Sequence, residues 1–451
     1  MHLLHNTLRP YAWGSTRAIA ELLGREPSGG PEAELWVGAH PDSPSTVLHP
    51  GGSRQGLDEL IGEDPEALLG PEVARRFDDR LPFLLKVLAA DSALSLQVHP
   101  SLDQAAAGFD AEEAAGVPRD APHRKYRDRN HKPEMIYALT PFEALCGFRP
   151  VAEAAATFAG LSDTVDPGSE IHAILDTVAA RLTAGGKDAL RSAFELLLAA
   201  PSRAVRDVAA AIEGRQAQAS PSQDLATVVE LNGQYPGDPG VLIALLLNRV
   251  SLRPGEALYL PAGNIHAYLR GLGIEVMASS DNVLRGGLTP KHVDTAELLA
   301  TVVFEPVTAP ALAPEYTLLD QELYRPPFDE FQLQRILLED GAAGRRAATS
   351  DPSYASASEE SDAPPPAGGS TTPAHVAVVQ NGPVVVLAVS GPILLDTPNA
   401  TLSVPRGGSA FVGASESPLV VRPAADGHGA TDGPVLAFAV TVGGAPTLRS
   451  A

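Results

Sequence analysis

The segment Ser95-Leu-Gln-Val-His-Pro100 decides the fold of this chain. Apolar Leu96 and Val98 alternate with polar Gln97 and His99, which is the two-residue period of a β-strand. The alternation predicts that Gln97 and His99 share one strand face. An amide oxygen and an imidazole side by side pack poorly in a core, but they are good metal ligands. The segment therefore predicts a β fold that carries a metal site.

Two other segments offer ligands of the same kind. Glu134 opens a predicted strand that continues over 135–139, and His266 follows a predicted strand and a Pro/Gly turn in Gly255-Glu-Ala-Leu-Tyr-Leu-Pro-Ala-Gly-Asn-Ile-His266. A single histidine is more often a packed core residue than a ligand. Two imidazoles, one carboxylate and one amide oxygen together suit a zinc ion and leave room for water or substrate. We therefore expect Gln97, His99, Glu134 and His266 to bind one Zn²⁺ per chain.

Composition limits the class of protein. The 451 residues are 44% apolar and exceed one typical domain, so two or three domains are expected. The formal charge of −22 argues against nucleic acid or an anionic membrane as a partner, because those surfaces need clustered cations. A single cysteine, Cys146, and a start without signal-peptide features indicate the cytoplasm. We expect a monomer that acts on a small molecule.

The pattern of apolar residues changes twice along the chain. Residues 1–150 and 235–310 mix short apolar strands with Pro/Gly turns, and we expect them to form one metal-binding β domain of the jelly-roll barrel type. Residues 151–234 are rich in alanine and have apolar residues at helical spacing. Helices are predicted over 151–159, 170–182, 187–199 and 202–213, as an insertion between the two halves of the β domain.

Residues 311–451 contain no paired ligand residues. Short strands are predicted at 376–379, 384–389 and 435–442, which indicates a second, jelly-roll-like β domain with a structural role. The segment 341–374 is rich in small residues, serine and proline, so we expect a flexible excursion there. The predicted fold class is mainly β with an α-helical insertion.

Seven segments in order resemble the type I mannose-6-phosphate isomerase family, a divergent branch of the cupins. The resemblance covers roughly residues 1–150 and 230–310, and its seven segments are Tyr11-Ala-Trp-Gly-Ser15, Ala33-Glu-Leu-Trp-Val-Gly-Ala-His-Pro41, Leu81-Pro-Phe-Leu-Leu-Lys-Val-Leu88, Ser95-Leu-Gln-Val-His-Pro100, Tyr126-Arg-Asp-Arg-Asn-His-Lys-Pro-Glu-Met135, Tyr259-Leu-Pro-Ala-Gly-Asn-Ile-His-Ala-Tyr268 and Asp281-Asn-Val-Leu-Arg-Gly-Gly-Leu-Thr-Pro-Lys291. Gly255, Pro261, Gly263 and His266 also follow the second cupin motif, with Arg270 where many cupins have asparagine.

The resemblance implies roles for the remaining polar residues of these segments. Its catalytic candidates are Lys132, Arg285, Asp281 and His131, of which His131 could instead steer Glu134 or contact substrate. Its candidates for substrate contacts are Trp13, Glu34, Lys86, Ser95, Tyr268 and Lys291. Because an acidic protein must gather local cations to hold a sugar phosphate, we expect the phosphate to bind some of Lys86, Ser95, Arg285 and Lys291.

The implied reaction is the reversible interconversion of mannose 6-phosphate and fructose 6-phosphate through a cis-enediolate. Lys132, two residues from Glu134, is our first choice for the base, and a metal-bound water is the second. Zinc or Arg285 would stabilise the developing negative charge. Asp281 and His131 are candidates for opening the sugar ring.

Two other classes of protein share part of this pattern. A cupin that binds a sugar or senses a metal without catalysis would not need Lys132, Asp281 and Arg285 in these positions. An iron dioxygenase normally uses more imidazoles, and Gln97 stands where many cupins have histidine. Zinc content together with an isomerase assay would separate the three.

Overall fold

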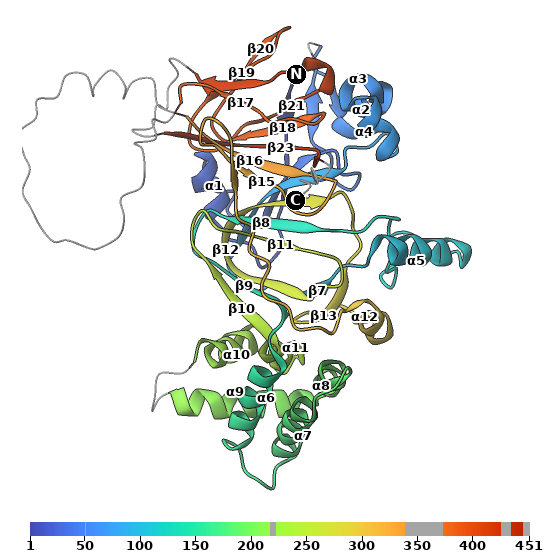
Figure 1. Ribbon diagram of the computed structural model, residues 1–451, viewed down its shortest axis with the longest axis vertical. Helices are drawn as coiled ribbons and strands as arrows, with labels where there is room; N and C mark the ends of the chain where they lie inside the picture. The colour runs from blue at the N-terminus through green and yellow to red at the C-terminus, as the bar shows by residue number, and fades with distance from the viewer. Residues whose placement is uncertain (50, 217–221, 339–372, 425–433, 445–451) are drawn as a thin grey trace, which may run out of the picture.

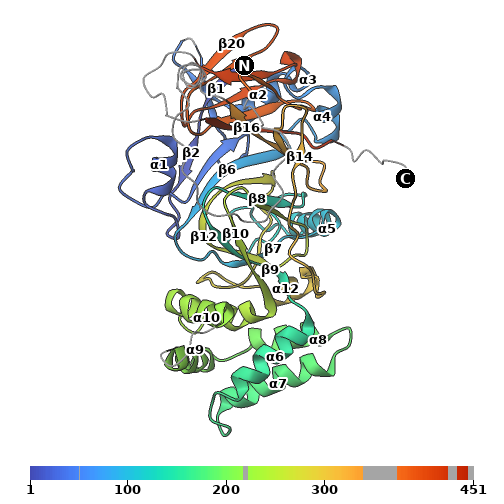
Figure 2. The same cartoon turned by 60° about the vertical axis from the view of Figure 1, so that its left-hand side comes forward.

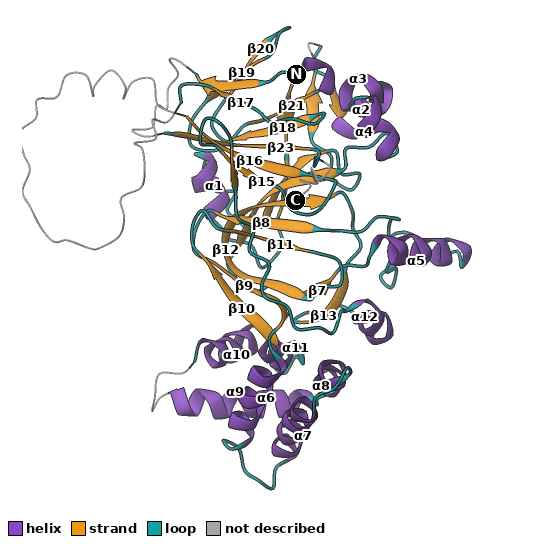
Figure 3. Cartoon of the chain, viewed as in Figure 1, coloured by secondary structure: helices purple, strands orange, loops and turns teal. Residues whose placement is uncertain are grey.

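The structure is a computed structural model that describes residues 1–49, 51–216, 222–338, 373–424 and 434–444. It is mainly β, with most of its long helices gathered at one end (Figures 1 and 3). The predicted fold class, mainly β with helices, is confirmed. Most of the predicted excursion at 341–374 lies outside the described residues.

One sheet carries the segments that matter for function. Among the described residues it has ten antiparallel strands: β2 (Thr7–Arg9), β3 (Glu34–Gly38), β6 (Phe83–Ala90), β7 (Leu96–Val98), β8 (Glu134–Ala138), β9 (Phe142–Phe148), β10 (Leu247–Leu252), β11 (Ala257–Leu260), β12 (His266–Ala278) and β13 (Leu284–Gly287). Strand β6 is buried along its whole length, as its apolar sequence predicts.

Strand β12 organises this sheet because it changes partners along its length. Residues 266–270 pair with β9, whereas residues 271–278 pair with β6. Gly271 lies at the change with φ of +131°, and a Cβ there would lie 2.8 Å from the carbonyl oxygen of Pro141. Only glycine fits such a bend without strain. The bend lets one strand serve both parts of the sheet.

A second and a third sheet occupy the end of the molecule opposite the helices of residues 151–243 (Figures 1 and 2). The described strands of the second sheet are β1 (His2–His5), β4 (Thr46–Leu48), β5 (Arg54–Gly56), β14 (Glu315–Tyr316), β15 (Glu322–Tyr324), β16 (Gln332–Leu338), β18 (Val384–Ala388), β21 (Ser409–Val412) and β23 (Val435–Thr441). The smaller sheet consists of β17 (Val376–Ala377), β19 (Ile393–Asp396), β20 (Thr401–Val404) and β22 (Val420–Pro423).

The second sheet crosses the expected domain boundaries. Strand β1 pairs with β21 on one side and β4 on the other, so N-terminal and C-terminal segments share this sheet. The predicted strands of the C-terminal part are confirmed in β17, β18 and β23. The division into domains at residues 150, 235 and 310 stays a prediction, and sheet membership does not follow it for residues 2–5 and 46–56.

The predicted helices are confirmed. They are α6 (Val151–Ser162), α7 (Glu170–Ala184), α8 (Ala189–Leu198) and α9 (Ser202–Gln216), followed by α10 (Gln223–Gln234) and α11 (Gly240–Ile243). In α7 the buried residues Ile171, Leu175, Val178 and Leu182 recur every three or four positions, so one face packs into the core.

The other described helices are shorter or lie beside the sheets: α1 (Ala18–Leu23), α2 (Leu57–Glu63), α3 (Pro65–Leu69), α4 (Pro71–Arg76), α5 (Leu102–Ala114) and α12 (Thr295–Thr301). Within the described residues, none of the helices is both long and apolar enough to traverse a bilayer.

Candidate metal centre

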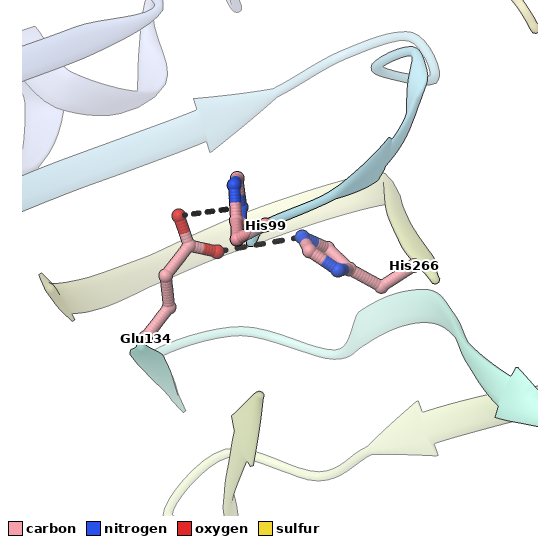
Figure 4. Close-up of side chains that lie close together, drawn as sticks. All are labelled: His99, Glu134 and His266. Atoms are coloured by element: carbon pink, nitrogen blue, oxygen red, sulfur yellow. Dashed lines mark ion pairs between the residues drawn. The ribbon is translucent and has the colours of Figure 1, made fainter. Parts of the chain in front are cut away.

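Three of the four predicted metal ligands meet in the interior of the first sheet. His99 follows β7, Glu134 opens β8 and His266 opens β12, and all three are buried. The Nε2 of His99 lies 3.3 Å from Glu134 Oε1, and the Nε2 of His266 lies 3.4 Å from Glu134 Oε2 (Figure 4). One donor atom from each lies within 4.8 Å of the others. This spacing allows all three to contact one metal ion.

Strand pairing explains how residues distant in sequence meet here. Leu260, the last residue of β11, is the antiparallel partner of Glu134. The chain then turns through residues 261–265 and returns as β12 with His266 at its start. Within that turn, the Gly263 amide donates a 2.9 Å hydrogen bond to the carbonyl oxygen of His99. The turn thus joins the three ligand segments.

Backbone carbonyls orient both imidazoles. The Nδ1 of His99 is 2.8 Å from the carbonyl oxygen of Asn282, and the Nδ1 of His266 is 3.0 Å from that of Asn264. A carbonyl only accepts, so each Nδ1 carries the hydrogen and each Nε2 keeps its lone pair. The Nε2 of His99 is buried and has no hydrogen-bond partner among the described residues. Two such nitrogens and a carboxylate fit a zinc ion.

Burial also keeps His99 neutral at physiological pH. Removal from water lowers the pKa of His99 to about 4, although Glu134 opposes this shift. Neutral imidazole is the form that binds metals.

Gln97, the fourth predicted ligand, is the direct antiparallel partner of His266. Directly opposed residues of antiparallel strands share a sheet face, so Gln97 lies on the face that carries His266. Its other neighbour across the sheet is Arg285 of β13. This register supports Gln97 as a neighbour of His266, and its role as a ligand stays a prediction.

Lys132 lies beside the cluster. Its Nζ is 2.8 Å from Glu134 Oε1, and its side chain is 10% exposed. Burial alone would raise the pKa of Glu134, but the nearby charge of Lys132 is the main cause that opposes it, and this pKa lies well below its usual range. Glu134 is therefore ionised.

A buried ion cluster lies next to Lys132 and differs from the expectation for Lys86. The Lys86 Nζ is 2.9 Å from Glu275 Oε2 and 3.6 Å from Glu34 Oε1. Glu34 also accepts a 2.7 Å hydrogen bond from the Trp36 indole. Burial disfavours the Lys86 charge, but the two carboxylates outweigh it and raise the pKa of Lys86. Lys86 thus forms ion pairs with two carboxylates and is a poor candidate for holding a phosphate.

Three other cations lie close together and are free of such partners. Arg285 of β13, Arg127 and Lys291 form no ion pair within the part of the chain that the structure describes. The nearby charge of Arg285 is the main cause that lowers the pKa of Lys291, and Arg127 adds to it. Burial, followed by the charge of Arg127, lowers the pKa of Arg285. We call Arg127, Arg285 and Lys291 the basic cluster.

Asp281 and His131 both line a cavity of about 900 Å³, together with Arg127 and His40. The His40 Nε2 lies 3.5 Å from Asp281 Oδ1. His131 does not touch Glu134; its Nε2 instead lies 2.5 Å from Glu330 Oε1. The two catalytic candidates therefore share one cavity. The contact between His131 and Glu330 was not predicted from the sequence.

The other predicted substrate contacts are spread around the sheet. Trp13 is half-buried and stacks on Tyr11 with ring centroids 5.7 Å apart. Tyr268 is buried between Phe142 and His266, and burial raises its pKa. Ser95 is half-buried, one residue before β7.

Asn282 organises the site and was missed by sequence reasoning. It is fully buried, and its Oδ1 accepts from the Arg127 amide at 2.7 Å. Its Nδ2 donates to the carbonyl oxygens of Asp128 and Asn130, both at 2.8 Å. Together with its bond to His99, these contacts fix the loop before Lys132. A polar residue directly after Asp281 was the only available signal.

Known proteins similar to this chain come from one family of enzymes. The family model described as "Phosphomannose isomerase type I, catalytic domain" matches residues 1–151. Mannose-6-phosphate isomerase of Escherichia coli is 38% identical over 435 residues, which are 95% of this chain and 98% of that protein. The enzyme of Bos taurus is 32% identical over 91% of this chain and 92% of its own length.

Solved structures agree with the sequence comparison. A zinc-bound mannose 6-phosphate isomerase aligns with a TM-score of 0.79 and 33% identity, and 98% of this chain and 99% of that chain are covered. The Salmonella typhimurium enzyme, bound to substrate (f6p) and zinc, aligns with a TM-score of 0.78, 34% identity and the same coverage. Fold and site together define a metal-binding isomerase of sugar phosphates. The chain belongs to the type I mannose-6-phosphate isomerase family.

Proposed function

We propose that this chain is a zinc-dependent mannose-6-phosphate isomerase that interconverts mannose 6-phosphate and fructose 6-phosphate. The observation that carries the proposal is the pairing of a buried metal-donor group with a free basic cluster, in a chain that is similar to such enzymes over nearly its whole length. The three donors are His99, Glu134 and His266, and we assign Gln97 as the fourth. A zinc ion held there supplies a Lewis acid for the sugar carbonyl.

Lys132 is the proposed base. It takes the proton from C2 of the open-chain aldose and returns it to C1, while the hydroxyl proton on O2 moves to O1, so no net proton is gained or lost. What supports this assignment is position: Lys132 is nearly buried and lies next to Glu134, one of the metal donors, where the sugar carbonyl would bind. Positioned general bases typically contribute about a hundredfold to ten-thousandfold in rate.

The basic cluster supplies two further functions. Arg285, which is partly buried and is the neighbour of Gln97 across the sheet, is assigned to the negative charge that develops on the enediolate oxygen. Lys291 and Arg127 are assigned to the phosphate, since an anion must be held against the formal charge of −22. Asp281 and His131 are assigned to ring opening.

We also propose a cytoplasmic location, which is supported by the single buried cysteine, Cys146. A monomer that binds neither nucleic acid nor membrane stays our expectation.

The proposal is tested with the purified, zinc-loaded chain and fructose 6-phosphate. Mannose 6-phosphate should accumulate until equilibrium, and unphosphorylated fructose should react far more slowly. Binding of the sugar phosphate without turnover would identify a non-catalytic binding protein instead. Oxygen consumption that depends on iron would identify a dioxygenase.

A further inference from the structure

The side chain of His131 is joined to the C-terminal part of the chain. Its Nε2 lies 2.5 Å from Glu330 Oε1, a contact between residues 199 positions apart. His131 is 24% exposed and Glu330 is 14% exposed, so the pair is largely shielded from water.

Packed aromatic side chains anchor the chain on either side of Glu330. It lies between β15 and β16, next to Phe331, which is fully buried. Phe328 packs edge-on against Tyr259 of β11, with centroids 5.7 Å apart. Strand β11 pairs with β8, the strand that begins with Glu134. The position of Glu330 is therefore tied to the sheet that carries the metal donors.

The second carboxylate oxygen of Glu330 is not satisfied. Its Oε2 is buried and has no hydrogen-bond partner within the described residues. Leaving a buried acceptor without a partner is destabilising, and most buried polar atoms in proteins have partners. A purely structural role does not explain this cost.

The contact with Glu330 sets the tautomer of His131. An ionised carboxylate only accepts, so the hydrogen of the neutral imidazole must lie on Nε2. The Nδ1 then keeps a lone pair and can exchange a proton. Carboxylates hold imidazoles in this way at acyl-transfer sites. His131, Glu330 and Asp281 all line the cavity of about 900 Å³.

We propose that Glu330 is a positioning residue that fixes His131 for ring opening, so the C-terminal part of the chain contributes to the active site. In this step Nδ1 takes the proton of the O1 hydroxyl, the C1–O5 bond breaks as the C1–O1 double bond forms, and O5 takes a proton from water. The remaining hydroxide then takes the proton from the imidazolium, which restores His131. The inference rests on the proposed isomerase function.

The test uses the full, zinc-loaded chain and measures kcat and KM for mannose 6-phosphate. Glu330→Ala should lower kcat about tenfold to a hundredfold, as loss of an orienting partner typically does, with KM changed less than about twofold. Glu330→Gln keeps an accepting oxygen and should recover part of kcat. Glu315→Gln is the matched control, because Glu315 lies on β14, the neighbour of β15, and pairs with Arg325 at 3.0 Å on the surface.

A double-mutant cycle decides whether Glu330 acts through His131. In a His131→Asn background, Glu330→Ala should cause no further loss of kcat. An equal loss in both backgrounds would overturn the inference, as would a parent-like kcat in both Glu330 variants. Since Gln matches Glu in shape, Glu330→Gln also covers the case in which the alanine variant does not fold. A parent chain that does not isomerise the sugar would refute the proposed function instead.

Discussion

Replacing Lys86 with methionine should destabilise the protein, because it leaves two buried carboxylates without their counter-ion. Lys86 is 5% exposed, Glu275 is 3% and Glu34 is 6%. Methionine has a similar length and fills the same space, so the change removes the charge and little packing. The perturbation therefore isolates the electrostatic contribution of the ammonium group.

The distances set the size of the effect. At an effective dielectric constant of about 20, charges 2.9 Å and 3.6 Å apart attract by about 6 and about 5 kcal/mol. The cost of burying the ammonium offsets much of this, so we expect a net loss of about 3–5 kcal/mol, as is typical when one partner of a buried pair is removed. Burial already raises the pKa of Glu275, and this carboxyl can take up a proton once Lys86 is gone. The loss should therefore be smaller at pH 5 than at pH 7.

Urea denaturation of the parent, Lys86→Met and Lys86→Met/Glu275→Gln measures this loss. The double variant should recover part of the free energy of unfolding, because it removes one of the stranded charges. Lys125→Met is the control, since Lys125 forms a 3.1 Å pair with Glu297 near the surface. Parent-like stability of Lys86→Met, combined with a raised KM for the sugar phosphate, would refute the reasoning and return Lys86 to the phosphate site.

Three other changes have defined outcomes. Lys132→Ala should keep one zinc per chain and lower kcat by about a hundredfold to ten-thousandfold, as metal analysis and initial rates would show. A zinc-loaded variant that still exchanges the C2 proton at the parent rate would exclude Lys132 as the base. Lys291→Ala should raise KM for mannose 6-phosphate roughly tenfold and leave the slow reaction of mannose unchanged, and an equal effect on both sugars would remove Lys291 from the phosphate site. Burial lowers the pKa of His40 from 6.5 to about 4 in the folded protein. Between pH 6.5 and pH 4 the unfolded chain therefore binds a proton on His40 that the folded chain does not, and this lowers the free energy of unfolding by about 3 kcal/mol as the pH drops. His40→Asn should reduce this pH dependence in urea titrations, and an unchanged slope would contradict it.

Local patterns were sufficient for much of the fold. The helices from α6 to α9 follow from apolar residues at helical spacing, and β6 follows from an apolar run that only Lys86 interrupts. Strand alternation around Gln97 and His99 also indicated His99 as a metal donor, and His99 lies in the donor group with Glu134 and His266. These features depend only on residues close in sequence.

Long-range pairing could not be predicted in the same way. The pairing of Lys86 with Glu275 depends on the register between β6 and β12, which are almost two hundred residues apart in sequence. The contact of His131 with Glu330 depends on how the C-terminal part packs on β11. The sharing of one sheet by β1 and β21 likewise depends on the whole topology. Sequence periodicity contains no information on these partners.

Zinc titration of the metal-free protein tests the central claim most directly. The chain is stripped with a chelator, and interconversion of mannose 6-phosphate and fructose 6-phosphate is followed as zinc is added. The account predicts no turnover without metal, full turnover at one zinc per chain, and no zinc-dependent recovery in His99→Ala. Full turnover of the metal-free chain, or of His99→Ala with zinc, would contradict it.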